Sequence, residues 1–324
     1  MWHYIVLAIG WVLKTIYELT RNYGVAIILF TIIIKCILIP LNIHSQKAMR
    51  KQQKVQPILA EIQKKYANDQ NRLQQETMKV YKENNISMTG GCLPLLIQMP
   101  ILLALYQAIQ KPLTYMFNVP YKGEALEKAT DVIEKVTQLK EAMISAGHNL
   151  GNIADDSVQQ LLQQSQIQIS KWAHTINGSG DPWYINFRFL GLDLSDEPSK
   201  AFGCFGDVMG NLSIVLLLII PILAVVASVA QNKISMHMTG QDKQTGNEQA
   251  QSMNKMMIWM MPVMTASFTL MLPAGLGLYW IISSVVQIVQ QIVLYYYFEK
   301  KGEDVVVRVP EDKHRHHRKK SKKR

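Results

Sequence analysis

The chain has 324 residues, with 34 Lys and Arg against 24 Asp and Glu and only three cysteines. Its charges avoid long stretches: residues 84–110, 208–232 and 256–298 carry none, and residues 22–46 carry one, Lys35. Because a helix needs roughly 20 apolar residues to cross a bilayer, this distribution excludes a soluble enzyme, a disulfide-stapled secreted domain and a disordered chain.

The N-terminal 22 residues contain a short apolar stretch, Tyr4–Leu13, bordered by aromatic and charged side chains. This stretch is too short to cross the bilayer comfortably, and no small-residue cleavage site follows it. We therefore expect residues 1–22 to form an amphipathic helix in the membrane interface. An uncleaved signal-like segment is the alternative.

Five later segments are apolar and long enough to span a membrane. They lie near residues 23–43, 90–109, 211–230, 256–272 and 276–297. Pro273–Gly275 divides the longest uncharged stretch, which favours a tight turn between the last two helices. The sequence predicts an all-α polytopic membrane protein with five transmembrane helices, the first two within residues 23–109 and the last three within residues 211–297.

Two polar regions connect these spans. Residues 46–84 predict a helical hairpin, because apolar side chains recur at helical spacing and residues 67–69 offer a turn. Residues 110–210 form a long loop with a helical insert over residues 120–180, in which two apolar stripes predict paired helices. The stripes comprise Leu126, Val132, Ile133, Val136, Leu139 and Met143, and then Leu161, Leu162 and Ile167, with Gly147–Gly151 between them. We assign these stripes to packing.

Basic residues gather on one predicted side of the membrane. Segments 44–89, 231–255 and 298–324 together carry 23 basic and 11 acidic residues, whereas segment 111–210 carries eight basic and twelve acidic ones. Because Lys and Arg are retained in the cytoplasm, the hairpin and the C-terminus should be cytoplasmic. The N-terminus and segment 111–210 should then be external.

The C-terminal tail, residues 298–324, is strongly basic and ends in an almost wholly basic run. Its charge suits ribosomal RNA or an anionic membrane surface, and a simple positive-inside signal is the alternative. His314, His316 and His317 lie in this run, where a metal site is not expected.

Lys35 lies near the middle of the first predicted span. About ten residues on either side correspond to roughly 15 Å of helix, which is farther than a lysine stem reaches. A lysine at this depth costs about 2.5–3.5 kcal/mol, and no span contains an acid to pair with it. The sequence therefore predicts a hydrated cavity that contains one positive charge. The alternative is that Lys35 lies closer to the interface and reaches the lipid headgroups.

Other polar side chains could line the same cavity. Thr31 lies one helical turn before Lys35, and the last span carries a polar row: Trp280, Ser284, Gln287 and Gln291. Simple helix–helix adhesion explains such residues equally well, and it is our preferred interpretation for Gln98 in the second span.

We find no pattern of catalytic, cofactor-binding or metal-binding residues. The sequence lacks a Ser/His/Asp arrangement, paired carboxylates in a span, a nucleotide-binding glycine motif and HExxH. Cys36 and Cys92 lie in apolar stretches and Cys204 is isolated, which is not a metal-ligand spacing. We expect neither an enzyme nor a cofactor.

Several long motifs resemble one known family. Residues 90–106, GGCLPLLIQMPILLALY, resemble the second core span of the YidC-type membrane protein insertases, bacterial members of the Oxa superfamily. Further segments are similar to family segments in the same order: TIIIKCILIPL (31–41), QPILAEIQKKY (56–66), FLGLDLS (189–195) and LPAGLGLYWIISSVVQIVQQ (272–291). The resemblance covers roughly residues 20–110 and 183–300.

The resemblance implies a five-helix core with a hydrophilic groove that is open to the cytoplasm and to lipid. The family usually has Arg at position 35, so Lys35 keeps the charge but loses the forked guanidinium. Thr31 and Trp280 fall at groove positions that contact substrate in the family. Ser87–Thr89 replaces the family's Asn-Pro-Leu before Gly90–Gly91. Segment 120–180 has no counterpart, and a short, Gram-positive-like form is expected.

These observations together predict a membrane protein insertase, which assists the insertion and folding of nascent membrane proteins in the bacterial cytoplasmic membrane. Its expected partners are nascent membrane proteins, the ribosome through the tail and hairpin, the lipid bilayer and, as a further candidate, the Sec translocon. No small-molecule substrate is expected. A transporter of a small anionic solute is one alternative, although no internal repeat supports it. A ribosome-tethering membrane protein is another, which would leave Lys35 unexplained.

Overall fold

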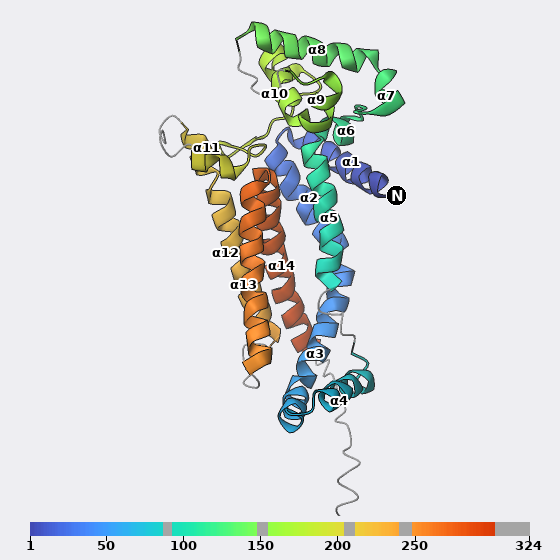
Figure 1. Ribbon diagram of the computed structural model, residues 1–324, viewed down its shortest axis with the longest axis vertical. Helices are drawn as coiled ribbons and strands as arrows, with labels where there is room; N and C mark the ends of the chain where they lie inside the picture. The colour runs from blue at the N-terminus through green and yellow to red at the C-terminus, as the bar shows by residue number, and fades with distance from the viewer. Residues whose placement is uncertain (87–92, 148–154, 204–210, 240–247, 302–324) are drawn as a thin grey trace, which may run out of the picture. The chain divides into compact units, whose positions relative to one another are not determined.

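The structure is a computed structural model that describes residues 1–86, 93–147, 155–203, 211–239 and 248–301 (Figure 1). These residues are mostly α-helical, with two very short strands. The chain divides into two compact units. The first comprises Met1–Cys36, Ile97–Ser228 and Val263–Ser284, and the second comprises Ile37–Leu96, Val229–Pro262 and Val285–Arg324.

Three long helices contribute residues to both units. They are α12 (Ile219–Thr239), α13 (Glu248–Met271) and α14 (Ala274–Lys301). The break between α13 and α14 falls at Leu272 and Pro273, where the sequence predicts a turn. Proline cannot donate the backbone hydrogen bond that a continuing helix requires.

The first unit contains most of the remaining elements. They are α1 (Trp2–Thr20), α2 (Tyr23–Ile37), α5 (Leu93–Gln110), α6 (Pro112–Phe117), α7 (Gly123–Glu127), α8 (Thr130–Ser145), α9 (Val158–Gln164), α10 (Gln166–Asn177), the 3-10 helices Gly178–Gly180 and Pro198–Gly203, the strands β1 (Arg188–Phe189) and β2 (Leu192–Asp193), and α11 (Leu212–Leu216). One apolar core joins α1, α2, α5, α6 and α14, with Tyr23, Phe30 and Leu105 fully buried.

Helix α1 is a continuous helix with two different faces. One face is buried in the core, including Val6, Leu13 and Tyr17, while Tyr4 and Trp11 on the other face are exposed. An exposed aromatic face on a helix of this kind is typical of a helix that contacts a membrane interface.

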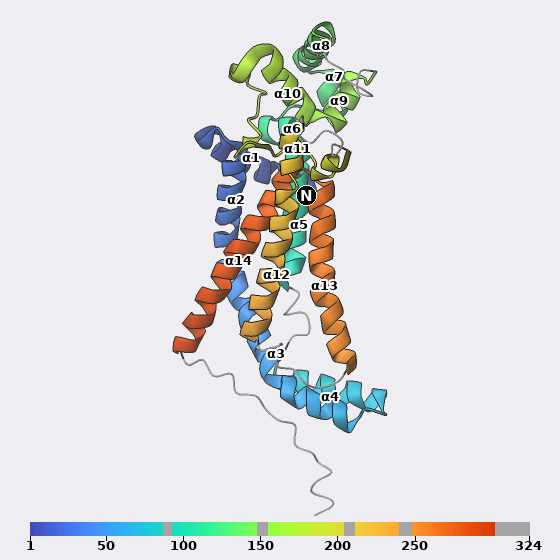
Figure 2. The same cartoon turned by 90° about the vertical axis from the view of Figure 1, so that its left-hand side faces the viewer.

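Helices α6 to α10 surround a second apolar core (green in Figures 1 and 2). Trp172, Leu161 and Val136 are fully buried there. The two predicted stripes meet in this core, with two differences. The first stripe begins in α7, which carries Leu126, and continues in α8 after a break at Lys128 and Ala129. The second stripe is divided at Ser165 into α9 and α10, and Ile167 packs on the first core instead. The predicted separator Gly147–Gly151 lies largely outside the described residues.

The strands β1 and β2 pair antiparallel around Leu190 and Gly191, which both have positive φ angles. The prediction of an all-α fold is confirmed for the described residues, in which this two-residue pairing is a small local exception. The pairing is too short to produce an alternating sequence pattern.

The second unit contains α3 (Ile39–Lys65) and α4 (Gln70–Glu83), which lie side by side in both views (Figures 1 and 2). Val55 and Leu59 on α3 pack against Val80 on α4. The Asp69 side chain accepts a hydrogen bond from the backbone N–H of Arg72 at 3.0 Å and so caps α4.

The single helix expected over residues 23–43 is interrupted. Helix α2 ends at Ile37 and α3 begins at Ile39, with Pro40 in the first turn of α3. Proline is favoured in a first turn and disfavoured inside a helix, so Pro40 explains why the interruption lies at Leu38.

Among the described residues, two helical segments are long and apolar enough to cross a membrane: Leu212–Met238 and Ala274–Lys300. A third is added if α2 and α3 form one interrupted span. Two further segments, Ile97–Gln110 and Pro262–Met271, are apolar but shorter within the described residues. The count of five transmembrane helices stays a prediction.

Candidate functional site

Lys35 lies in the last turn of α2 and is only 7% exposed. Its ammonium donates a hydrogen bond to the Gln98 side-chain oxygen on α5, with an Nζ–Oε1 distance of 3.3 Å. The lysine therefore meets an uncharged acceptor from a second helix.

Gln98 connects Lys35 to a third helix. Its amide nitrogen donates to the hydroxyl of Tyr279 on α14, and this hydroxyl also hydrogen bonds to Ser283 one turn later. Lys35, Gln98, Tyr279 and Ser283 thus form one polar network across α2, α5 and α14. We call these four residues the lysine network.

Thr31 and Trp280 lie close in sequence to members of this network, but the contacts of their side chains are with other residues. Thr31 is fully buried, and its hydroxyl donates to the backbone oxygen of Ile27 at 2.6 Å, within its own helix. Trp280 is half-buried and stacks on Phe268 of α13, with the ring centroids 6.4 Å apart.

The remaining members of the predicted polar row divide between the two units. Ser284 is buried in the first unit. Gln287 and Gln291 belong to the second unit, where Gln291 is buried and its Oε1 atom has no hydrogen-bond partner among the described residues. The structure therefore groups Lys35 with Gln98 and Tyr279, and it does not test the assignment of the whole row to one cavity.

Gln98 and Tyr279 were not among the predicted site residues. The sequence gives one indication of Gln98, because its polar amide lies inside an uncharged stretch. Tyr279 and Ser283 form a polar row of their own on α14, one residue before the predicted row. Only the packing of three helices reveals that these side chains meet Lys35.

Backbone hydrogen bonds hold the start of α14, at two residues that precede the predicted span 276–297. The N–H groups of Ala274 and Gly275 donate to the backbone oxygens of Asp196 and Leu194, at 2.9 and 2.8 Å. These bonds satisfy donors that a helix N-terminus otherwise leaves without partners. The segment after β2 therefore positions the helix that carries Tyr279.

Ion pairs fix this segment in turn. The Lys171 ammonium lies 2.9 Å from one carboxylate oxygen of Asp193 and 3.6 Å from Asp196. Burial raises the pKa of the Asp193 carboxyl, whereas Lys171 and a hydrogen bond from Ser195 lower it, and the net pKa is below its usual value. Asp193 is therefore ionised at neutral pH and holds α10 to β2.

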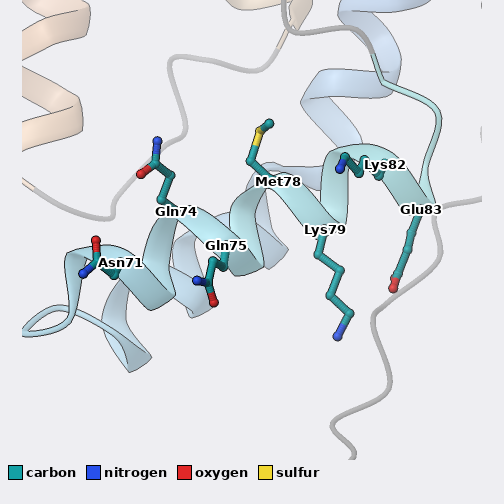
Figure 3. A pocket seen from close by; sticks show the side chains of 7 residues that line it. All are labelled: Asn71, Gln74, Gln75, Met78, Lys79, Lys82 and Glu83. Atoms are coloured by element: carbon teal, nitrogen blue, oxygen red, sulfur yellow. The ribbon is translucent and has the colours of Figure 1, made fainter.

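A separate shallow hollow runs along α4 (Figure 3). The described residues that line it are Asn71, Gln74, Gln75, Met78, Lys79, Lys82 and Glu83. Most of the lining residues have polar or charged side chains of both signs, and none of them is a predicted site residue. No group of three or more His, Cys, Asp or Glu side chains in the described part of the chain could hold a metal ion.

The second unit has its own contacts between α3 and α14. The Arg50 guanidinium donates to the backbone oxygen of Tyr295 at 3.1 Å and lies 4.8 Å from the centre of the Phe298 ring. The Asn42 amide donates to Gln290 at 2.9 Å. These contacts connect α3 to the second half of α14. The predicted tail beyond residue 301, with its three histidines, and the predicted helix start at Gly90–Gly91 lie outside the described residues.

The fold and site define a helical membrane protein with a buried lysine in an otherwise uncharged helix. The family model for the 60Kd inner membrane protein matches residues 15–301. The chain belongs to this family, which confirms the resemblance seen in its motifs.

Individual relatives agree with this assignment. The chain is 28% identical to "Membrane protein insertase YidC 2" of Listeria innocua over 295 residues, 90% of this chain and 70% of that protein. It is 56% identical over 97 residues to "Membrane protein insertase YidC" of Clostridium tetani, and 45% identical over 112 residues to the protein of that name from Leptospira interrogans. These matches span only 40% and 18% of the two relatives.

Proposed function

We propose that this protein is a membrane protein insertase in which Lys35 attracts acidic groups of a segment that must cross the bilayer. The observation that carries the proposal is the buried lysine itself. It lies in an otherwise uncharged stretch and is held by the uncharged amide of Gln98. The names of the relatives, membrane protein insertases, support the same activity.

The energetic argument concerns the cost of the charge. A lysine in the middle of a span costs about 2.5–3.5 kcal/mol on insertion scales. A leucine or alanine at this position would avoid that cost, so packing does not explain the lysine. A positive charge at this depth attracts an acidic group that comes within about 4–6 Å, because opposite charges favour each other's charged forms.

A positive charge in a hydrophilic groove would lower the free-energy barrier that a polar segment of a nascent protein meets when it crosses the bilayer. Such a segment otherwise faces about 30 Å of hydrocarbon. The groove would shorten this dry path, and Lys35 would bind acidic side chains transiently. Burial of the client's apolar span in lipid would then drive the reaction.

The remaining parts of the proposal concern topology and partners. Five transmembrane helices would place the N-terminus outside and the C-terminus in the cytoplasm of a bacterial cell. The pairing of α3 with α4 supports a hairpin that could receive a nascent chain. The hairpin and the basic tail would contact the ribosome, and the Sec translocon is a candidate partner for larger clients.

The test uses purified protein in liposomes and a short single-span substrate with an acidic external tail. Protease protection measures insertion by wild type, Lys35→Ala and Lys35→Arg. We expect Lys35→Ala to lower the insertion rate about tenfold, the effect of losing one hydrogen bond between charged groups. Lys35→Arg should retain activity because it retains the charge.

Lys200→Ala is the matched control, because Lys200 is an exposed lysine outside the predicted spans. It should insert the substrate as wild type does. Equal insertion by all four proteins would remove Lys35 from the mechanism. Insertion no better than in empty liposomes would count against the insertase itself and favour the transporter or the ribosome tether.

A further inference from the structure

The C-terminal end of α14 carries four consecutive aromatic residues: Tyr295, Tyr296, Tyr297 and Phe298. Tyr296 is 65% exposed and Tyr297 is 54% exposed, whereas Phe298 is only 3% exposed. Tyrosine is enriched where a membrane meets water, because its ring is apolar and its hydroxyl is polar. These residues therefore indicate where α14 leaves the hydrocarbon of the bilayer.

The length of α14 gives the same depth. The helix begins at Ala274, and at about 1.5 Å per residue Tyr295 lies about 32 Å farther along it. The hydrocarbon core of a bilayer is about 30 Å thick. A helix that begins at one interface of the membrane therefore reaches the opposite interface near Tyr295, and its last turns extend into the headgroup layer.

Helix α3 brings two cations to this end of α14. The Arg50 guanidinium donates to the backbone oxygen of Tyr295 at 3.1 Å and lies 5.4 Å from the centre of the Tyr295 ring. The Phe298 ring lies beneath both cations, with its centre 4.8 Å from Arg50 and 5.5 Å from the Lys47 ammonium. All of these residues belong to the second unit. The contacts therefore hold a guanidinium and an ammonium at headgroup depth.

The charge of this part of α3 is one-sided. Between Ile39 and Ala60 the helix contains no acidic residue and four basic ones: Lys47, Arg50, Lys51 and Lys54. Among the described residues, Arg50 forms no ion pair with a carboxylate. A carbonyl oxygen and two aromatic rings carry only partial negative charge. An anion from outside the chain would therefore be attracted to this guanidinium.

The neighbouring surface of α14 is apolar. Val289 and Val293 precede Tyr297 by two helical turns and one helical turn, so the three side chains share one face. Both valines are exposed. A ligand that carries an anionic group at headgroup depth and apolar chains below it would match both parts of this surface. A phospholipid has this form, whereas RNA offers phosphate without the apolar chains.

We propose that Arg50 and Lys47 bind the phosphate of an anionic phospholipid whose acyl chains contact the exposed apolar face of α14. The forked guanidinium matches the geometry of a phosphate group. Basic pockets between helices on the cytoplasmic side of a membrane bind anionic headgroups, and the charge distribution predicts that α3 lies on this side. The site needs no client protein, so it goes beyond the proposed insertase function.

The experiment uses the full chain in phosphatidylcholine vesicles that contain a small fraction of phosphatidylglycerol with a photoreactive diazirine. Illumination, proteolysis and mass spectrometry then identify the labelled peptides. A second set of vesicles contains phosphatidylcholine with the same diazirine. Arg50→Gln removes the charge, Arg50→Lys keeps the charge without the fork, and Lys47→Gln leaves the bond between Arg50 and Tyr295 in place.

We expect phosphatidylglycerol to label α3 and the end of α14 at least fivefold more than phosphatidylcholine does. Arg50→Gln should lower this labelling about fivefold, the effect of one basic side chain beside an anionic membrane surface. Arg50→Lys should retain part of it, and Lys47→Gln should lower it about twofold to fivefold. Labelling by phosphatidylcholine should not change in any variant, whereas a misfolded variant would change both.

Arg72→Gln is the matched control. Arg72 is an exposed arginine on α4 in the same unit, outside the aromatic end of α14, and its replacement should leave the labelling as in wild type. Equal labelling by the two lipids in wild type would overturn the inference. So would labelling that neither Arg50→Gln nor Lys47→Gln lowers, or a photoreactive RNA oligonucleotide that labels the same peptides in place of the lipid. None of these outcomes depends on whether the protein inserts a substrate.

Discussion

The buried lysine of α2 differs in its surroundings from the lysines that form ion pairs in the described part of the chain. Outside the predicted spans, Lys135 and Lys171 each pair with a carboxylate, Asp181 and Asp193. Lys35, inside a predicted span, donates a hydrogen bond to the Gln98 amide. The ion pairs of Lys135 and Lys171 fix local structure, whereas Lys35 is buried in an otherwise uncharged stretch, where the proposed function requires a positive charge. This contrast separates a structural role from the proposed functional role.

Asp181 allows the structural role to be tested by pH. Its side chain is buried and accepts from Lys135 at 2.9 Å, from the Asn177 amide at 2.8 Å and from the backbone N–H of Trp183 at 2.8 Å. Burial raises the pKa of this carboxyl, whereas the hydrogen bonds from Trp183 and Lys135 lower it. The net pKa is below its usual value.

A pKa that is lower in the folded state stabilises the fold above the unfolded-state pKa, and the effect disappears as pH falls through the folded-state pKa. Asp181→Asn should therefore be less stable than wild type at pH 7, by about 1.5–3 kcal/mol for hydrogen bonds to a charged group. The difference should shrink as pH falls below about 4. Denaturant titration that follows a ¹⁹F label on Trp183 measures it.

The control for this prediction is Asp131→Asn, at an exposed position on α8. It should leave the stability near that of wild type at every pH. A difference between Asp181→Asn and wild type that stays constant from pH 7 to pH 2 would show that the carboxylate charge is not responsible.

At the scale of elements, the helix that carries Tyr279 depends on a close approach between α12 and α14. A methyl group at Gly277 would collide with the Cγ2 atom of Ile220. Ile220 is buried and branched at Cβ, so its methyl cannot easily turn away. Gly277 therefore permits α14 to approach α12 two residues before Tyr279.

Gly277→Ala should destabilise the first unit by about 1–3 kcal/mol, the usual cost of overpacking. The double variant Gly277→Ala with Ile220→Ala should lose less stability than the two single variants lose together, because the truncated side chain leaves room for the new methyl. Unfolding in mixed detergent micelles, followed by circular dichroism, gives the coupling energy between the two positions.

Gly275→Ala is the control in the same helix. The nearest side-chain atom there is the flexible end of Ile27, 3.1 Å from the new methyl. This variant should change stability little. Equal losses at Gly275 and Gly277 would indicate a general intolerance of the helix start rather than a specific contact with Ile220.

The elements that follow from local chemistry were predictable from the sequence. The turn at Pro273 and the apolar stripe of α8 are examples, because a proline and a helical periodicity carry the information themselves. The interruption at Leu38 was signalled by Pro40 but was not predicted. The hairpin around Leu190 could not be predicted, because it depends on tertiary packing rather than on a local pattern.

The candidate site divides in the same way. Lys35 stands out in the sequence, because a charge in an apolar stretch is conspicuous without any structure. Gln98 and Tyr279 do not, because polar residues inside spans more often serve helix adhesion. Their meeting with Lys35 depends on which turns of α2, α5 and α14 face one another, and a single sequence does not contain that information.

At the scale of the whole molecule, the charge distribution predicts which parts lie on each side of the membrane. Helix α4 lies in the segment 44–89, with nine basic and four acidic residues, and α8 lies in the segment 111–210, with eight basic and twelve acidic ones. Because Lys and Arg are retained in the cytoplasm, this distribution predicts that α4 lies inside and α8 outside.

Two matched cysteine variants test this topology. Gln75 on α4 and Gln138 on α8 are both exposed glutamines within helices, so either can be changed to cysteine with little structural cost. The three natural cysteines are first replaced by alanine. A membrane-impermeant maleimide should then label Gln138→Cys in intact cells and label Gln75→Cys only after the membrane is opened.

The two variants act as controls for each other, because the labelled residue and its helical setting are the same. Labelling of Gln75→Cys alone in intact cells would indicate the opposite orientation. Lys35 would then have to attract clients from the other side of the membrane. Labelling of both would place α4 and α8 on one side and contradict the five-span arrangement, since an odd number of crossings must separate them. The expected pattern leaves the hairpin where a nascent chain emerges and the insert where the translocated tail arrives, as insertion from the cytoplasm requires.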